Sequence, residues 1–226
     1  MSNKHLVAVL MDGGFISRHV KKALRPTGYP EAQHFLALAK ACINPVDEEL
    51  FRIYFYDSPP FGEKTQHPLT KEQVTFKNRY YDYRMQLLKQ LAESDNVALR
   101  KGDLNFVGWR LTKKAVKAFI EGRKTQLAPD DVEPDFRQKC VDMMIGLDVA
   151  WLSNKSIVEK IVLIANDRDF VPPMKHARRE GVRIVIVEWP GQYRVLSELR
   201  IHADEVRRLP EGTACLGMTT APAPDR

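Results

Sequence analysis

The sequence is poor in the features that mark exported, membrane-spanning and zinc-dependent proteins. Its 226 residues include three cysteines, Cys42, Cys140 and Cys215, which lie far apart with no C-x-x-C pair, so neither a disulfide framework nor a cysteine zinc site is indicated. The six histidines lack the spacing of metal ligands, which argues against a zinc deaminase or hydrolase. No apolar run approaches the roughly 18 residues of a membrane span, and the start of the chain lacks a signal-peptide core. We therefore expect a cytoplasmic protein with no membrane partner.

The overall composition is that of a globular chain. Hydrophobic residues make up 44% and charged residues 28%, which excludes a disordered class. Lys and Arg number 35 against 29 Asp and Glu, a net charge of +6 that is compatible with a polyanionic partner without identifying one. A chain of this length favours a single sizeable domain.

Short apolar runs alternate with helical patterns along the chain. Four runs read as strands buried on both faces, each ending near a glycine, proline or polar turn: Leu6–Met11, Leu50–Tyr56, Ile161–Ala165 and Val182–Val187. Five stretches carry apolar residues at helical spacing: Glu31–Ala41, Lys71–Ala92, Val141–Ser153, Val171–Glu180 and Val195–Arg200. This alternation predicts an α/β fold with a mostly parallel central sheet covered by helices.

The same pattern of strands, helices and loops indicates how the chain is organised into domains. We predict a single domain over residues 1–210 with an inserted helical elaboration around residues 59–98, where a proline-containing loop leads into a long polar helix pattern. The segment Arg123–Pro134 is expected to be a charged connector. Residues 211–226 are expected to form a flexible C-terminal tail.

Four aspartates are expected at one edge of this sheet. Asp12 directly follows the first strand, Asp167 and Asp169 follow the strand at Ile161, and Asp142 opens the helical stretch that must run back from the same edge. Ligands of open parallel sheets bind at the carboxyl ends of the strands. Four acids in one crevice repel each other unless a cation neutralises them, and such oxygen ligands suit Mg²⁺ or Mn²⁺. This arrangement favours metal-assisted phosphodiester hydrolysis.

Each acid also has an ordinary structural interpretation. An Asp at a strand-to-helix junction is often the N-cap of the helix, and Asp169 could cap the helix that begins near Val171. Asp148 follows Asp142 by six residues, roughly 120° around a helix, so it need not share the same face. We expect Asp148 to support the site or the fold rather than to bind metal.

Several motifs together resemble the NYN domain, a branch of the PIN-like nucleases. The resemblance spans residues 6 to 209 and is carried by motifs in matching order and spacing: Asp12-Gly13-Gly14, Tyr56-Asp57-Ser58-Pro59-Pro60, Leu99-Arg100-Lys101-Gly102, Lys139-Cys140-Val141-Asp142 with Asp148, Ile164-Ala165-Asn166-Asp167-Arg168-Asp169-Phe170-Val171-Pro172, Gly181-Val182-Arg183-Ile184 and Ala203-Asp204-Glu205.

The resemblance implies a three-layer α/β sandwich and divalent-metal-dependent cleavage of RNA. Asp12, Asp142, Asp167 and Asp169 match the acidic site of the family as its catalytic and metal-binding residues. The chain departs from the family pattern at Phe15, where members commonly have Asn, and at Ala165-Asn166, which replaces a frequent Ser-Gly. Asn166 is expected to support the site by hydrogen bonding.

Basic residues suggest where a nucleic acid would bind. The segment from Arg110 to Lys124 has six basic residues and one acid, and the candidates for phosphate contact are Lys113, Lys114, Lys117, Arg168 and Lys175. A solvated helix face is the competing interpretation of such a charge run. Phe76, Tyr80 and Tyr83 lie among basic residues and could stack on the bases of a single-stranded nucleic acid. Their helical spacing fits a position in the hydrophobic core equally well.

Two functions remain open at this stage. The first is a metal-dependent endoribonuclease acting on single-stranded or structured RNA, and the alternative is a non-catalytic RNA-binding or regulatory protein that retains the NYN fold. An aspartyl-phosphate phosphatase is disfavoured because Gly13 and Gly14, not a second acid, follow Asp12. Retention of all four acids favours catalysis, since a phosphate binder has no reason to concentrate negative charge. The oligomeric state is left open, with a homodimer as one option.

Overall fold

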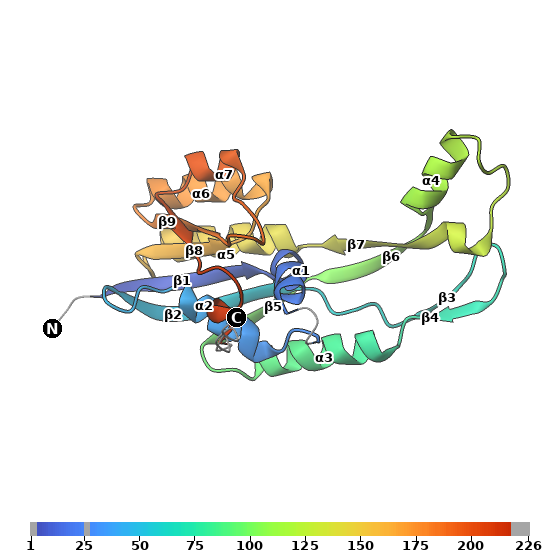
Figure 1. Ribbon diagram of the computed structural model, residues 1–226. Helices are drawn as coiled ribbons and strands as arrows, with labels where there is room; N and C mark the ends of the chain where they lie inside the picture. Colours follow the sequence, from blue (N-terminus) through green and yellow to red (C-terminus); the bar gives the residue numbers. More distant parts are fainter. Residues whose placement is uncertain (1–3, 25–27, 218–226) are drawn as a thin grey trace, which may run out of the picture.

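Six parallel strands form the central layer of the computed structural model, which describes residues 4–24 and 28–217 (Figure 1). Their order across the sheet is β10-β9-β8-β1-β2-β5. The strands are β1 (His5–Asp12), β2 (Glu48–Asp57), β5 (Val97–Lys101), β8 (Lys160–Ile164), β9 (Arg183–Glu188) and β10 (Glu205–Arg208). The first strand of the sequence is therefore interior, between β2 and β8.

Alternate residues of each strand face two separate hydrophobic layers. Val7 and Val9 of β1 pack on one side and Ala8 and Leu10 on the other, and all four are fully buried. Helices α1 (Gly13–Ala23), α2 (Ala32–Ala41) and α3 (Arg79–Ala92) cover the first face. Helices α5 (Val141–Asn154), α6 (Val171–Arg179) and α7 (Ser197–Ile201) cover the second. The predicted three-layer α/β sandwich with a parallel central sheet is confirmed.

An antiparallel ribbon projects beyond the carboxyl edge of the sheet (Figure 1). It consists of β6 (Asp103–Leu111) and β7 (Val132–Lys139), and its tip bears α4 (Lys113–Ile120) and the short 3-10 helix η1 (Pro129–Asp131). A register shift between Phe106 and Gly108 bends the ribbon, and Gly108 adopts a φ of 145° that favours glycine. We call this projection, residues 103–139, the arm.

The apolar side of the arm is covered by the segment that precedes α3. The rings of Phe61 and Phe76 from this segment contact Phe106 and Phe136 of the ribbon, with centroids 5.2 to 6.0 Å apart. The same segment contains a small hairpin of β3 (Lys64–Gln66) and β4 (Gln73–Thr75). Phe76 is thus part of an aromatic cluster and not a free stacking platform.

The helix predicted over Lys71–Ala92 is correct only in its second part. Residues 73–75 are strand β4, and α3 begins at Arg79, because the Asn78 side chain accepts hydrogen bonds from the amides of Tyr80 and Tyr81 at 3.0 Å each and caps the helix there. The buried leucines of α3 pack against the central sheet, so this helix belongs to the sandwich. The parts of the chain that project beyond the sheet are the arm and the segment before α3 that packs on it (Figure 1).

Three further expectations need correction. The glycines after Asp12 begin helix α1 and do not end the strand in a turn. The expected connector Arg123–Pro134 contains η1 and the start of β7. In the expected tail, Cys215 and Leu216 are buried in the core beside α2, because they cover an apolar surface, whereas residues 218–226 lie outside the described part of the chain. The division into one domain and an insertion stays a prediction.

Among the described residues, no helix is both long and apolar enough to cross a membrane.

Candidate functional site

Three of the four predicted acids line one hollow at the carboxyl edge of the sheet. The hollow has a volume of about 330 Å³. Its lining residues are Asp12, Gly14, Phe15, Arg18, Gln138, Val141, Asp142 and Asp167. They come from the end of β1 and the start of α1, the end of β7 and the start of α5, and the loop after β8. We call this hollow the acidic pocket.

Asp12 lies at the junction of β1 and α1. Its Oδ1 accepts a hydrogen bond from the Phe15 amide at 3.1 Å, so it is also the N-cap of α1. Burial, together with the negative charges of Asp142 and Asp57, raises the pKa of Asp12 to about 6. The hydrogen bond from the Phe15 amide lowers this pKa, but its effect is smaller than that of burial. A cation that enters the pocket would therefore stabilise the charged form of the Asp12 carboxyl group.

Gly13 permits the tight junction after Asp12. A Cβ at this position would lie 2.6 Å from the Tyr56 carbonyl oxygen and 2.7 Å from the Asp57 carboxylate. No larger residue fits between the start of α1 and the end of β2, and this close approach fixes where the Asp12 side chain leaves the sheet.

Asp142 lies in the first turn of α5 and is exposed. Partial desolvation and the charges of Asp167 and Asp169 raise its pKa. The end of β8 and the start of α5 thus bring these carboxylates close enough to repel each other.

Asp167 directly precedes the single turn η2 (Arg168–Phe170), and Asp169 is the middle residue of that turn. The Asp167 side chain accepts a hydrogen bond from the Asp169 amide at 3.0 Å, which is a capping contact. Asp169 acts on Asp142 through its charge but does not line the acidic pocket. Of the four predicted acids, Asp12, Asp142 and Asp167 are the ones that share the pocket.

The two residues predicted to support the site have clear partners. Asn166 receives a hydrogen bond from the Leu196 amide at 2.9 Å and donates one to the Arg194 carbonyl at 3.0 Å, which ties the end of β8 to the loop before α7. Asp148 accepts from the Tyr56 hydroxyl at 2.8 Å and from Arg100 Nε at 2.9 Å. Asp148 thus faces β2 and β5 and does not line the acidic pocket, which agrees with the rotation of roughly 120° that separates it from Asp142.

The predicted phosphate contacts are spread over three places. Lys113, Lys114 and Lys117 are on α4 at the tip of the arm, away from the acids (Figure 1). Arg168 pairs with Glu198 at 3.1 Å. Lys175 borders a different hollow, together with Arg178, Arg179 and Arg183. Their role in substrate binding stays a prediction, and within one chain they do not form a single surface.

Sequence reasoning missed several residues at or next to the pocket. Asp57 ends β2 beside Asp12, is buried, and pairs with the buried Arg84 at 2.5 Å. The signal for Asp57 is the one that identified Asp12, an acid directly after a buried strand. Gln138 and Arg18 also line the pocket, but nothing in their sequence neighbourhoods marks them.

The pocket offers the oxygen donors that a hard divalent cation prefers. Carboxylates of Asp12, Asp142 and Asp167, with the amide oxygen of Gln138, match the ligand types of Mg²⁺ and Mn²⁺. Within the described ranges, no group of three or more His, Cys, Asp or Glu side chains is arranged so that it could hold a metal ion by itself. Mg²⁺ usually keeps several waters and uses one or two carboxylates together with substrate phosphates, so an open donor set of this kind fits it.

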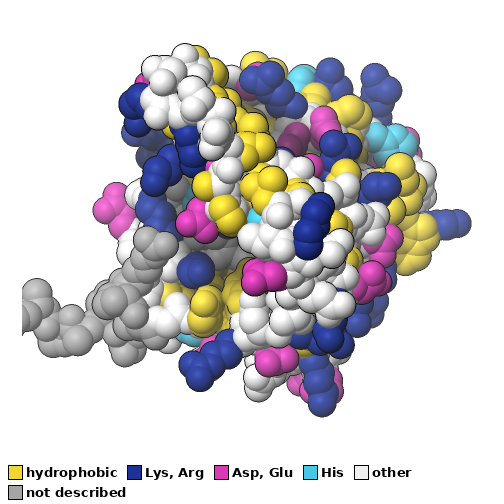
Figure 2. All heavy atoms as spheres, turned by 90° about the vertical axis from the view of Figure 1, so that its right-hand side faces the viewer, with side chains coloured by type: hydrophobic (Ala, Val, Ile, Leu, Met, Phe, Trp, Pro, Cys, Tyr) yellow, Lys and Arg dark blue, Asp and Glu magenta, His cyan; other side chains and the backbone are white. Residues whose placement is uncertain are grey.

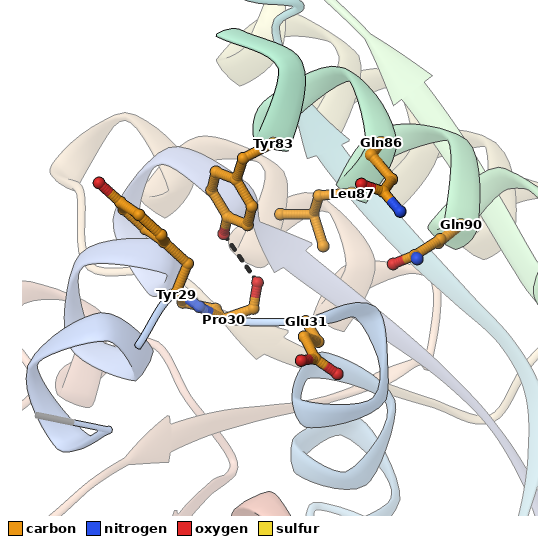
Figure 3. Close-up of a pocket in the computed structure, with 7 residues that line it drawn as sticks. All are labelled: Tyr29, Pro30, Glu31, Tyr83, Gln86, Leu87 and Gln90. Atoms are coloured by element: carbon orange, nitrogen blue, oxygen red, sulfur yellow. Dashed lines mark hydrogen bonds between the residues drawn. The ribbon is translucent and has the colours of Figure 1, made fainter. Parts of the chain in front are cut away.

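A second hollow lies on the other face of the sheet, between the start of α2 and α3 (Figure 3). It has a volume of about 420 Å³, and the Tyr83 hydroxyl at its side donates to the Pro30 carbonyl at 2.8 Å. Tyr29 stacks on Tyr83 with ring centroids 4.7 Å apart. None of the predicted catalytic acids borders it.

The sequence model of the NYN-domain family matches residues 7–208 of this chain. The chain belongs to the NYN-domain family. NYN domains are a branch of the PIN-like nucleases, which generally use divalent metals. A crystal structure of a protein of unknown function from Vibrio parahaemolyticus is similar at 14% sequence identity with a TM-score of 0.46, covering 93% of this chain and 96% of that chain. No curated protein matches the sequence.

Proposed function

We propose that this NYN protein is a divalent-metal-dependent endoribonuclease whose active site is the acidic pocket. Asp12, Asp142, Asp167 and Asp169 are assigned as its catalytic and metal-binding residues, with Mg²⁺ or Mn²⁺ as the cofactor. The observation that carries this proposal is the meeting of Asp12, Asp142 and Asp167 in one hollow at the carboxyl edge, where burial and neighbouring charges raise the pKa of Asp12 to about 6.

The residues of the pocket divide the work of such a reaction. When bound, the cation supplies a hydroxide at neutral pH and charge stabilisation for the phosphoryl oxygens. The carboxylates of Asp12, Asp142 and Asp167 would hold it, and Asp169 would add negative charge beside them. Arg18 borders the same hollow, and its Nε donates to the Gly14 carbonyl at 3.1 Å. Its terminal guanidinium nitrogens have no partner among the described residues and can donate to a phosphate. Asn166 keeps the loop that carries Asp167 and Asp169 in place.

The test is incubation of the purified protein with RNA and DNA of mixed sequence in Mn²⁺, Mg²⁺ or EDTA. We expect internal cleavage of RNA with either metal and none in EDTA. Calorimetric titration of Mn²⁺ provides an independent readout, and it should show binding to the wild type that weakens strongly in Asp167→Asn. Absence of both cleavage and metal binding would overturn the proposal.

A non-catalytic RNA-binding role is the second candidate. The capping contacts favour it, because Asp12 and Asp167 each accept a hydrogen bond from an amide in the first turn of a helix. Both residues therefore have a structural role that needs no metal. RNA binding that is equal in EDTA and Mn²⁺, with no cleavage of any substrate, would support this candidate instead.

A further inference from the structure

Two helices of this protein have large apolar side chains facing solvent in a regular row. On α5, Met143, Leu147 and Trp151 follow at intervals of four residues and are 70%, 63% and 49% exposed. On α4, Val116 and Ile120 are also four residues apart and are 39% and 80% exposed. Rows of this kind on the surface of a folded domain mark interaction surfaces.

The outer face of α5 lacks a cover among the described residues. Ile145 and Val149 on its inner face are buried against the sheet, while the row of Met143, Leu147 and Trp151 points the other way. A helix that is apolar on both faces is normally covered on both. The row begins one residue after Asp142, so this uncovered face lies next to the acidic pocket.

The exposed face of α4 is shaped to receive another element. It borders an apolar groove of about 300 Å³ lined by Leu111, Lys113, Val116, Lys117, Ile120 and Glu121. Figure 2 views the molecule from the end that bears the arm, and hydrophobic side chains are exposed there beside Lys and Arg. Lys113 and Lys114 have no ion-pair partner in the part of the chain that the structure describes.

The charges of the two helices select how these faces can pair. Helix α4 begins with Lys113 and Lys114, whereas α5 has the exposed Asp142 in its first turn; Asp148 of α5 is already paired with Arg100, and Lys117 of α4 with Glu121. Pairing of α4 with a second α4, or of α5 with a second α5, brings like charges together, but α4 against α5 brings opposite charges together. The order of residues also matches, since on both helices the charged residues at the start precede the apolar row.

Helix α4 is positioned to meet the α5 of another molecule. It stands at the far end of an arm whose strand β6 has nine residues, roughly 30 Å at the usual rise of a strand, and α5 starts at the base of that arm (Figure 1). Two copies related by a two-fold axis can each place α4 on the other's α5, and this contact occurs twice and closes the assembly.

We propose that this protein forms a two-fold dimer by reciprocal exchange of its arms, with α4 of each subunit packed on the outer face of α5 of the other. The exchange brings Lys113 and Lys114 of one subunit to the Asp142 end of the other subunit's α5. Each acidic pocket then has lysines beside it that its own chain does not provide. Their use in holding RNA rests on the proposed function, whereas the dimer itself does not.

The first test is the mass in solution, measured by sedimentation equilibrium at micromolar concentrations. We expect twice the chain mass of 25.9 kDa for the wild type. Ile120→Lys and Leu147→Lys should each give monomers with an unchanged circular dichroism spectrum, since both side chains are exposed. Ile201→Lys is the matched control, because Ile201 is 71% exposed on α7, outside the proposed contact, and this variant should stay dimeric. A monomeric wild type, or a dimer that survives both interface changes, would overturn the proposal.

Mixing the two monomeric variants tests which helix meets which. A heterodimer of Ile120→Lys with Leu147→Lys retains one intact α4–α5 contact, so the mixture should form dimers that neither variant forms alone. If α4 instead paired with α4, Leu147→Lys would stay dimeric by itself, because Leu147 lies on α5, and mixing would form no dimers beyond those of that variant. Failure of the mixture to associate would therefore exclude arm exchange.

Cross-linking locates the contact without any reference to cleavage. Cys140 is exposed at the start of α5, while Cys42 and Cys215 are buried. A short bismaleimide should join Cys140 of one Lys113→Cys subunit to residue 113 of the other and give a covalent dimer. The control Lys40→Cys places the new thiol on α2 across the sheet and should give no such product. Equal cross-linking in both variants would contradict the proposal.

Discussion

Asp12 experiences two opposing influences, a helix amide that favours its charged form and a buried, acidic environment that disfavours it. A residue that only capped α1 would not need Asp142 and Asp167 beside it. The two interpretations predict different results for an amide substitution, since Asn caps a helix about as well as Asp but carries no charge.

The first prediction is that Asp12→Asn and Asp167→Asn each abolish metal-dependent RNA cleavage. The substitution removes charge from the cation site while keeping shape and capping, so the melting temperature should change little. Gel-based cleavage with Mn²⁺ and thermal unfolding by circular dichroism are the measurements. Cleavage within about threefold of the wild type in both variants, with unchanged stability, would return these residues to the capping role.

Asp148 should behave in the reverse way. Its carboxylate pairs with Arg100 and accepts a hydrogen bond from the Tyr56 hydroxyl, so Asp148→Asn should cost roughly 1 to 3 kcal/mol of unfolding free energy. Metal affinity should stay close to that of the wild type. Urea unfolding and calorimetric Mn²⁺ titration measure the two quantities. A large loss of metal binding with full stability would contradict this separation of roles.

At the scale of elements, the start of α5 contains a residue in an unfavourable conformation. Cys140 has a φ of 70°, in the left-handed region that glycine adopts readily and other residues adopt at a cost of about 1 to 2 kcal/mol. Because glycine also gains freedom in the unfolded chain, Cys140→Gly should be more stable by only about 0.5 to 1 kcal/mol. Urea unfolding checks this, with Cys140→Val as the control that should be less stable.

A buried ion cluster joins the amino ends of β2 and β8 to β10. Glu48 is 2% exposed and accepts hydrogen bonds from Lys160 at 2.9 Å and from both terminal nitrogens of Arg207 at 2.8 and 2.9 Å. Burial alone would raise the pKa of Glu48, but these bonds and that from the Asn44 amide outweigh it and lower the pKa to about 2.

The pH dependence of stability follows from this shift. Since the folded pKa lies below the unfolded one, the contribution of Glu48 is fully present above about pH 4.5 and is lost as pH falls toward 2. We expect the free energy of unfolding to decrease more steeply over this interval in the wild type than in Glu48→Gln, which cannot titrate at this position. Chemical unfolding at a series of pH values from 7 to 2.5 measures both slopes, and equal slopes would contradict the assignment.

The elements differ in how far the sequence predicts them. The strands at Leu6, Ile161 and Val182 are nearly continuous apolar runs because helices cover both their faces, and this pattern has few other interpretations. The strands of the arm are half exposed, and β7 includes Pro134 and several charged residues, so they lack that signal. The acids could be placed because the carboxyl ends of parallel strands share one edge. The position of α4 could not be predicted from the sequence, because it depends on the direction in which the arm projects.

At the scale of the whole molecule, the lysines of α4 give a prediction about RNA affinity. Changing Lys113, Lys114 and Lys117 together to Gln should weaken RNA binding regardless of sequence and reduce its salt dependence, by about 0.7 in the log–log slope for each phosphate of a single strand that is no longer neutralised. Cleavage of saturating RNA should change little. The measurement is affinity against salt concentration in an Asp167→Asn background, which prevents turnover.

The control for this prediction is a change of two exposed lysines outside α4. Lys40 and Lys89 lie on α2 and α3, on the other face of the sheet, and their replacement by Gln should leave both affinity and slope unchanged. Parallel lines of equal affinity for the α4 variant and the wild type would show that these lysines form only a solvated surface.

The strand order also has a consequence for how the chain reaches its folded state. β1 is synthesised first yet lies inside the sheet, where Val7 pairs with Leu50 of β2 on one side and with Lys160 of β8 on the other. Its second edge therefore stays open until most of the chain has left the ribosome, and closing so long a loop slows folding. During that interval the exposed apolar edge of β1 is where a chaperone would bind or where nascent chains would aggregate.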